Sequence, residues 1–103
     1  MVYLKKRAVN DLFRLLVRLL QWKKYPHTYT QADAYITDIE KKCYELETLT
    51  HREKTKFLTH IRFGKYVYRY DKHANIQWYL IYDIDKKGNI IVKKIMSNNS
   101  TKK

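Results

Sequence analysis

Basic side chains recur along the β-prone second half of this 103-residue chain. They are Lys54 and Lys56 ahead of the first long β-prone run, Lys65 and Arg69 within that run, and Lys93 and Lys94 within the last one. The chain then ends in amides, hydroxyls and lysines, in the sequence "SNNSTKK". Fixed cations beside amide donors complement a phosphate group, and cations stabilise negative charge that develops on a reacting phosphate. The pattern therefore predicts that this part of the protein faces a polyanion.

Acid–base chemistry needs a group that exchanges protons near neutral pH, and histidine is the usual one. The four histidines are His27, His51, His60 and His73. Their spacing fits no metal-ligand motif, so we expect no metal and no cofactor. His60 lies two residues before Arg62 and is the histidine that we single out as a candidate catalytic acid. The single cysteine, Cys43, falls on the apolar face of an expected helix and is interpreted as a small buried hydrophobe, not a nucleophile.

Charge is the most informative bulk property of the chain, which carries 22 Lys and Arg against 10 Asp and Glu, for a net charge of +12. Such an excess attracts nucleic acid, an anionic membrane or an acidic protein. One cysteine cannot form an intramolecular disulfide, which favours a reducing compartment. Arg14 and Arg18 interrupt the apolar run "LFRLLVRLL", so we expect neither a targeting signal nor a membrane span. We therefore predict one cytoplasmic domain over residues 1–103.

The first half of the chain predicts a short strand, "MVYL", and then a helical hairpin. Apolar residues repeat at helical spacing within 5–24, with Val9 and Phe13 widening the apolar face, and Arg7 can pair with Asp11 on the opposite face. The second helix is expected to start at Thr28 or Thr30 and to end near residue 49. Acidic side chains gather in this segment.

After Thr50 the apolar pattern changes to the two-residue period of strands. The segments "HIRFG", "KYVYRYD", "IQWYLIYDID" and "NIIVKKIM" read as three or four strands joined by tight turns. On the second of these segments, the three tyrosines share one face, which we expect to pack beneath the helices, although the same rings could stack on bases. Arg69 lies on the other face and could pair with Asp71 or Asp83. The expected fold class is α+β: a strand, a helical hairpin and an antiparallel meander packed on the helices.

Four stretches carry a family resemblance: "LKKRAVNDL" at the start of the helical hairpin, "FGKYVYRY", "QWYLIYDI" and the final "IMSNN". Together, in this order, they resemble the RelE/ParE toxin superfamily of bacterial type II toxin–antitoxin systems over nearly the whole chain. The resemblance implies a cognate antitoxin as partner. It also implies one of two activities: ribosome-dependent cleavage of messenger RNA without a metal, or inhibition of DNA gyrase.

The resemblance also assigns roles to individual residues. Nucleases of this family position RNA so that a 2′-hydroxyl attacks the neighbouring phosphate, with Lys and Arg stabilising charge and a His, Tyr or Glu assisting proton transfer. Arg69 corresponds by position to an arginine used at the phosphate, and Lys93 to a basic residue on the final strand. Asn98 and Asn99 stand where many relatives have His or Tyr. These four residues are the expected catalytic set, and the expected nucleic-acid contacts are Lys54, Lys56, Arg62, Lys65 and Lys94.

Two other functions remain open from the sequence. A basic nucleic-acid-binding domain without enzymatic activity would use the same cations and cleave nothing. The first helix is also basic and amphipathic, so it could lie on an anionic membrane or fill a partner's groove, but its apolar face is needed to cover the sheet. For the toxin reading, we expect Lys93, Asn98 and Asn99 to lie beside Arg69 as one phosphate-binding surface.

Overall fold

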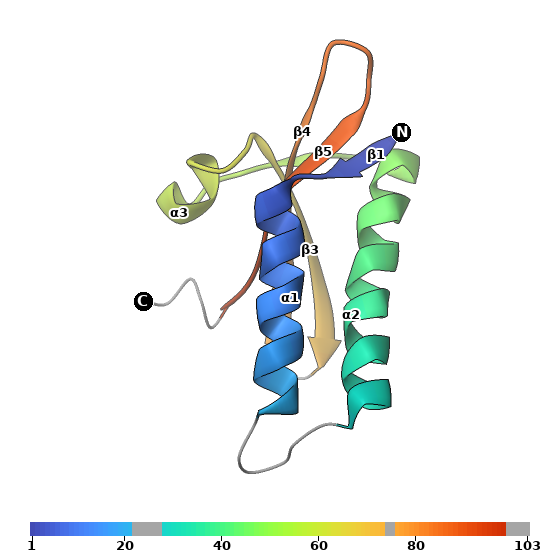
Figure 1. Cartoon of the computed structure of the whole chain (residues 1–103). Helices are drawn as coiled ribbons and strands as arrows, with labels where there is room; N and C mark the ends of the chain where they lie inside the picture. The colour runs from blue at the N-terminus through green and yellow to red at the C-terminus, as the bar shows by residue number, and fades with distance from the viewer. Residues whose placement is uncertain (22–27, 74–75, 99–103) are drawn as a thin grey trace.

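The computed structural model describes residues 1–21, 28–73 and 76–98. The elements run in the order β1 (Val2–Leu4), α1 (Lys6–Leu20), α2 (Tyr29–Tyr44), η1 (Glu45–Thr48), β2 (Glu53–Lys54), α3 (Leu58–Ile61), β3 (Tyr66–His73), β4 (Ile76–Ile84) and β5 (Ile90–Ser97). Figure 1 shows α1 and α2 side by side against the sheet. The expected α+β class is confirmed, with helices and a five-stranded, largely antiparallel sheet packed together.

The helix α1 buries a narrow stripe, made of Ala8, Leu12 and Leu15 at spacings of four and three. Val9 and Phe13, which were expected to widen this stripe, are instead 49% and 64% exposed. The reason is the position of α1 at one side of the molecule, where it packs against β5 and α2 and leaves its remaining faces open. Residues 22–27, which include the predicted end of this helix, lie outside the described residues. None of the described helices is both long and apolar enough to cross a membrane.

The helix α2 begins with the predicted capping box. The Gln31 backbone N–H donates to the Thr28 hydroxyl at 3.2 Å, and the Thr28 backbone N–H donates to the Gln31 side chain at 3.0 Å. The apolar stripe of α2 continues through Cys43 into η1. Burial raises the pKa of the Cys43 thiol to about 12, so the thiol stays neutral. This confirms the interpretation of Cys43 as a buried hydrophobe.

The five strands form one sheet in the order β1-β5-β4-β3-β2. The strands β2 to β5 pair antiparallel, as a meander requires. The strand β1 pairs parallel with β5, from Val2 opposite Ile90 to Leu4 opposite Val92. Parallel neighbours need a long crossover, which α1, α2 and the earlier strands provide here. The sequence predicted the first strand but not this pairing.

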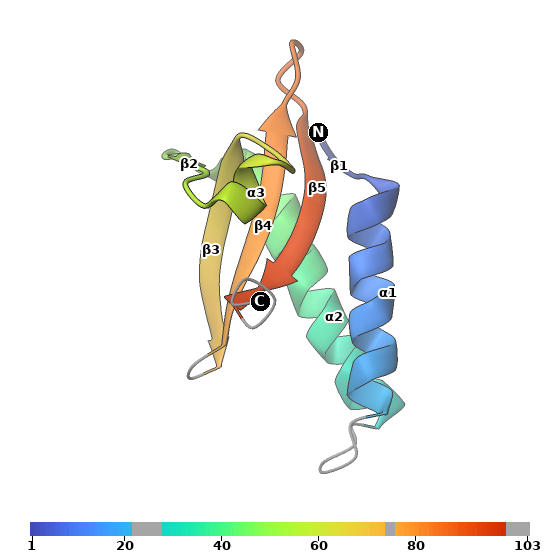
Figure 2. The same cartoon turned by 90° about the vertical axis from the view of Figure 1, so that its left-hand side faces the viewer.

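The two faces of the sheet are covered differently. The helix-covered face carries Tyr66, Tyr68, Tyr70, Trp78, Leu80, Tyr82, Ile90, Val92 and Ile95. The other face carries a small cluster of Val67, Tyr79 and Ile81 with Phe63 and Met96. Figure 2 shows α3 in front of the strands and α2 behind them. The three tyrosines of β3 therefore pack toward the helices, as expected, while Arg69 lies on the opposite face.

The prediction of a strand for the segment "HIRFG" is wrong: His60 and Ile61 belong to the short helix α3, and a turn follows before β3 begins at Tyr66. The backbone N–H groups of Phe63 and Gly64 both donate to the His60 carbonyl oxygen, which is a helical pattern. His60 is buried with its ring 4.6 Å from that of Tyr79, whereas Ile61 is half exposed. The expected alternation would bury the apolar Ile61 and expose His60. The structure reverses this, so the two-residue period led to a wrong assignment of this segment. The edge strand is instead the two-residue β2.

Candidate functional site

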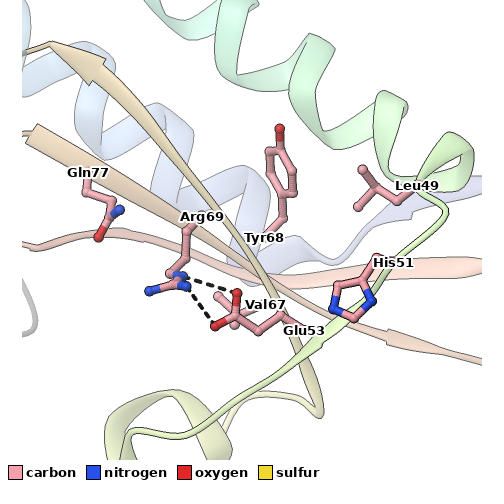
Figure 3. Close-up of a pocket in the computed structure, with 7 residues that line it drawn as sticks. All are labelled: Leu49, His51, Glu53, Val67, Tyr68, Arg69 and Gln77. Atoms are coloured by element: carbon pink, nitrogen blue, oxygen red, sulfur yellow. Dashed lines mark hydrogen bonds and ion pairs between the residues drawn. The ribbon is translucent and has the colours of Figure 1, made fainter.

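An open pocket of about 370 Å³ lies at the β3 edge of the sheet. It is lined by Leu49, His51, Glu53, Val67, Tyr68, Arg69 and Gln77 (Figure 3). The strand β2 pairs with β3 only at Glu53 and Lys54, so no other strand of the described residues lies along the rest of this β3 edge. The segment before β2 borders the opening with Leu49 and His51, and β2 itself brings Glu53 to Arg69.

The Arg69 guanidinium and the Glu53 carboxylate form a two-point ion pair. Arg69 Nε donates to Glu53 Oε2 at 3.2 Å, and Arg69 Nη2 lies 3.0 Å from Glu53 Oε1 (Figure 3). Strand register explains the contact: Glu53 is opposite Val67, and Arg69 is two residues farther along the same face of β3. Arg69 therefore pairs with Glu53 and not with Asp71 or Asp83, as the sequence had suggested. The long-range pairing of β2 was not visible in the sequence.

Arg52 anchors the segment that carries His51 and Glu53. Its Nη1 donates to the Leu46 carbonyl oxygen and to the Tyr82 hydroxyl, both at 3.2 Å. Since successive side chains in an extended segment point to opposite sides, the partly buried Arg52, held by Leu46 and Tyr82, leaves both of its neighbours on the side of the pocket. His51 is exposed, and Figure 3 shows its ring near Glu53. Sequence reasoning passed over His51, Arg52 and Glu53, although the alternation in "HRE" was a usable signal.

Three side chains that line the pocket, His51, Glu53 and Arg69, have complementary chemistry. A carboxylate can accept a proton, an imidazole can donate or accept one near neutral pH, and a guanidinium can stabilise charge on a phosphate. In this arrangement the carboxylate also fixes the position of the guanidinium. The set therefore contains one group for each demand of phosphodiester cleavage by an internal hydroxyl.

The sheet cations Lys93 and Lys94 contact two different carboxylates. Lys93 is the extra residue of a bulge in β5, because Ile81 pairs with Lys94 and Tyr82 with Val92. The Lys93 Nζ lies 2.9 Å from Asp83 Oδ2. Burial raises the pKa of Asp83, but the hydrogen bonds from Lys93 and from the Lys65 backbone N–H outweigh it and hold the pKa below its usual value.

Lys94 reaches the first helix. Its Nζ lies 2.8 Å from Asp11 Oδ1, and the Ile95 backbone N–H donates to Asp11 Oδ2 at 3.0 Å. Asp11 therefore binds the part of the β5 edge that lies beyond the pairing of β5 with β1. It does not pair with Arg7, the partner proposed from helical spacing. Lys94 is largely withdrawn from solvent, whereas the other expected nucleic-acid contacts, Lys54, Lys56, Arg62 and Lys65, are exposed.

Lys93 and Asn98 were expected beside Arg69, but the order of the strands does not place them there. The strand β4 lies between β3 and β5, so these side chains stand on strands about 10 Å apart. Asn98 accepts a hydrogen bond from the Gln77 backbone N–H at 3.4 Å, near the start of β4. Asn99 lies outside the described residues.

His60, the candidate acid from the sequence, is only 1% exposed. Burial lowers the pKa of its imidazole, and within the described part of the chain its Nε2 has no hydrogen-bond partner. The ring packs between Phe57 and Tyr79, beneath α3. A substrate on the surface cannot reach this ring, so His51 replaces His60 as the candidate proton donor.

No protein-family model matches the chain, and neither does any curated protein or solved structure. Within the described residues, no group of three or more His, Cys, Asp or Glu side chains is arranged to hold a metal ion. The guides to function are therefore the geometry of the pocket and the charge around it.

Proposed function

We propose that the chain is a toxin of the RelE/ParE type that cleaves messenger RNA on the ribosome, in the bacterial cytoplasm, without a metal or other cofactor. The observation that carries the proposal is the pocket in which Glu53 holds Arg69 and His51 lines the same opening. A net charge of +12 on 103 residues supports a polyanionic substrate.

The cleavage step assigns one role to each side chain. The 2′-oxygen of a bound nucleotide attacks the adjacent phosphorus and gives its proton to Glu53. Arg69 stabilises the added negative charge on the phosphate oxygens. The bond from phosphorus to the 5′-oxygen then breaks, and His51 donates a proton to that oxygen, leaving a 2′,3′-cyclic phosphate. One proton is accepted and one is donated, so a paired base and acid complete the reaction.

The test is cleavage itself. After brief expression in bacteria, primer extension should map new 5′ ends within translated messages, and purified protein should cleave messages on programmed ribosomes. Wild-type protein that leaves messages intact in both assays would contradict the proposal. Inhibition of DNA supercoiling by the same preparation would then favour the gyrase alternative, which Asn98 supports because an amide cannot transfer protons near neutral pH. Nucleic-acid binding with neither activity would favour the non-enzymatic alternative.

The proposal includes a cognate antitoxin, and the surface around α3 supports it. Phe57, Leu58 and Ile61 are 57%, 85% and 50% exposed, and the exposed Lys56 and Arg62 flank them in the sequence. An apolar patch beside cations fits an acidic, amphipathic segment that folds on binding. Co-expression with an adjacent short gene should yield a complex that survives high salt, because apolar contacts are not screened. A complex that dissociates in salt, or no complex with such a product, would contradict this part.

A further inference from the structure

A basic groove lies where α1 faces the edge of β5, away from the pocket of Arg69. Its volume is about 670 Å³, and Lys6, Arg7, Arg14, Arg62, Phe63 and Lys94 contribute to its lining. Arg18 lines an adjoining pocket that shares Arg14 and Lys94 with the groove. The groove shares no lining residue with the pocket of Arg69, so the two sites are distinct.

The groove has a large excess of positive charge. In the part of the chain that the structure describes, Asp11 is the one acidic residue of its lining, and both Asp11 oxygens are already bound, by Lys94 and by the Ile95 backbone N–H. Among the described residues, Arg7, Arg14 and Arg62 have no carboxylate within ion-pair distance. Their charges remain available to a ligand.

Three cations of the groove converge on one aromatic ring. The Arg7 and Arg62 guanidinium carbons lie 5.2 and 5.5 Å from the Phe63 ring centroid, and Lys94 Nζ lies 5.4 Å from it. Cation–π attraction supports each contact separately, but like charges gathered at one ring repel one another. Lys94 alone has a carboxylate partner there. A bound anion would relieve the repulsion between Arg7 and Arg62.

The basic face of α1 extends this cluster in one direction. Arg7, Arg14 and Arg18 are spaced by seven and four residues, which places them along one side of a helix. At 1.5 Å per residue the stripe is about 16 Å long, enough to follow several phosphates of a nucleic-acid strand. The shape of the charged surface is therefore a line rather than a single anion site.

We propose that this groove binds the phosphodiester backbone of a nucleic acid, as a site separate from the pocket of Arg69. Arginine predominates, and its planar fork matches two phosphate oxygens at once. An acidic protein segment would need apolar surface for the core of its interface, and Phe63 is the single apolar residue among the described residues that line the groove. Binding here does not depend on cleavage, so the inference stands apart from the proposed nuclease activity.

The test compares two double variants with the same change in charge. Arg14→Ala/Arg18→Ala removes two exposed groove cations, and Lys86→Ala/Lys87→Ala removes two exposed cations from the β4–β5 turn. Binding is measured by fluorescence anisotropy with a 2′-O-methyl RNA oligonucleotide, which cannot undergo 2′-hydroxyl attack, and with a DNA duplex, at several salt concentrations. Circular dichroism confirms that both variants are folded.

The groove variant should raise the Kd for nucleic acid about tenfold and reduce the slope of log Kd against log salt by about 1.4 for single strands. The turn variant should change the Kd less than about twofold. Preference for the RNA or the DNA probe identifies which nucleic acid the groove takes, and either result supports the proposal. Equal losses in the two variants, absence of binding by the wild type, or displacement by polyglutamate at equal charge concentration would overturn it.

Discussion

Replacing Arg69 by alanine separates a catalytic role from a structural one. The Arg69 and Glu53 side chains are 46% and 31% exposed, so solvent screens their ion pair. Half-exposed pairs of this kind contribute at most about 1 kcal/mol to stability, and Arg69→Ala should therefore remain folded. If Arg69 stabilises the transition-state phosphate, its removal should slow cleavage on the order of a hundredfold, equivalent to about 2.7 kcal/mol. The activity should fall far more than the stability.

The assay is single-turnover cleavage of a message on programmed ribosomes, with urea denaturation of each variant alongside. Arg69→Lys keeps the charge but loses the two-point contact with Glu53, and we expect a rate between those of the wild type and Arg69→Ala. Lys54→Ala removes an exposed cation on the edge strand, and it should mainly weaken binding and lower the salt dependence. Asn98→Ala lies two strands away from Arg69 and should cleave at a rate close to wild type.

Glu53→Gln tests whether the pair acts as a unit. The double variant Glu53→Gln/Arg69→Ala should be about as slow as the slower single variant, because each residue depends on the other. Multiplied losses in the double variant would show two independent contributions. Equal cleavage rates in wild type, Arg69→Ala and Glu53→Gln would refute the assignment of the pocket as an active site.

Further predictions concern contacts outside the pocket of Arg69, and each is checked by urea denaturation. Asp11→Asn leaves the Lys94 ammonium without a carboxylate in a largely buried position and should cost about 2 kcal/mol, whereas Asp33→Asn, at an exposed position, should change stability by less than about 0.5 kcal/mol. Burial lowers the pKa of His60 below its usual 6.5, so the unfolded chain takes up the proton first and stability should fall as the pH drops below 6.5; His60→Leu should show a smaller fall. Gly64→Ala should cost about 1–3 kcal/mol, because a Cβ there would lie 3.0 Å from a core side chain and 3.1 Å from a carbonyl oxygen. Equal effects of the two Asn variants, parallel pH profiles with and without His60, or a neutral Gly64→Ala would contradict the respective argument.

Local signals in the sequence were sufficient for the helical hairpin and the main strands. The Thr28 capping box, the helical spacing through Cys43 and the alternation of β3 each depend on neighbours a few residues apart. Such patterns are set by the geometry of one helix or one strand, so they can be read before the tertiary structure is known.

The pocket could not be predicted in this way because it depends on long-range register. Glu53 lies 16 residues before Arg69, and the two meet only because a two-residue strand pairs with β3. Asp11 and Lys94 are 83 residues apart, and their pairing requires the position of α1 against β5. The nearer partners suggested by the sequence satisfied local spacing but not the actual arrangement of the elements.

Three carboxylates from three elements hold three cations of the sheet. Glu53 binds Arg69, Asp83 binds Lys93 and Asp11 binds Lys94. Each pair lowers the positive charge at its site, but it also fixes a long side chain whose ordering would otherwise oppose binding of a ligand. Among the described residues, Arg7, Arg14 and Arg62 of the α1 groove lack such partners, and their charges can meet a phosphate backbone. The chain therefore separates positioned cations on the sheet, suited to geometry-dependent chemistry, from unpaired cations along α1, suited to salt-dependent attachment.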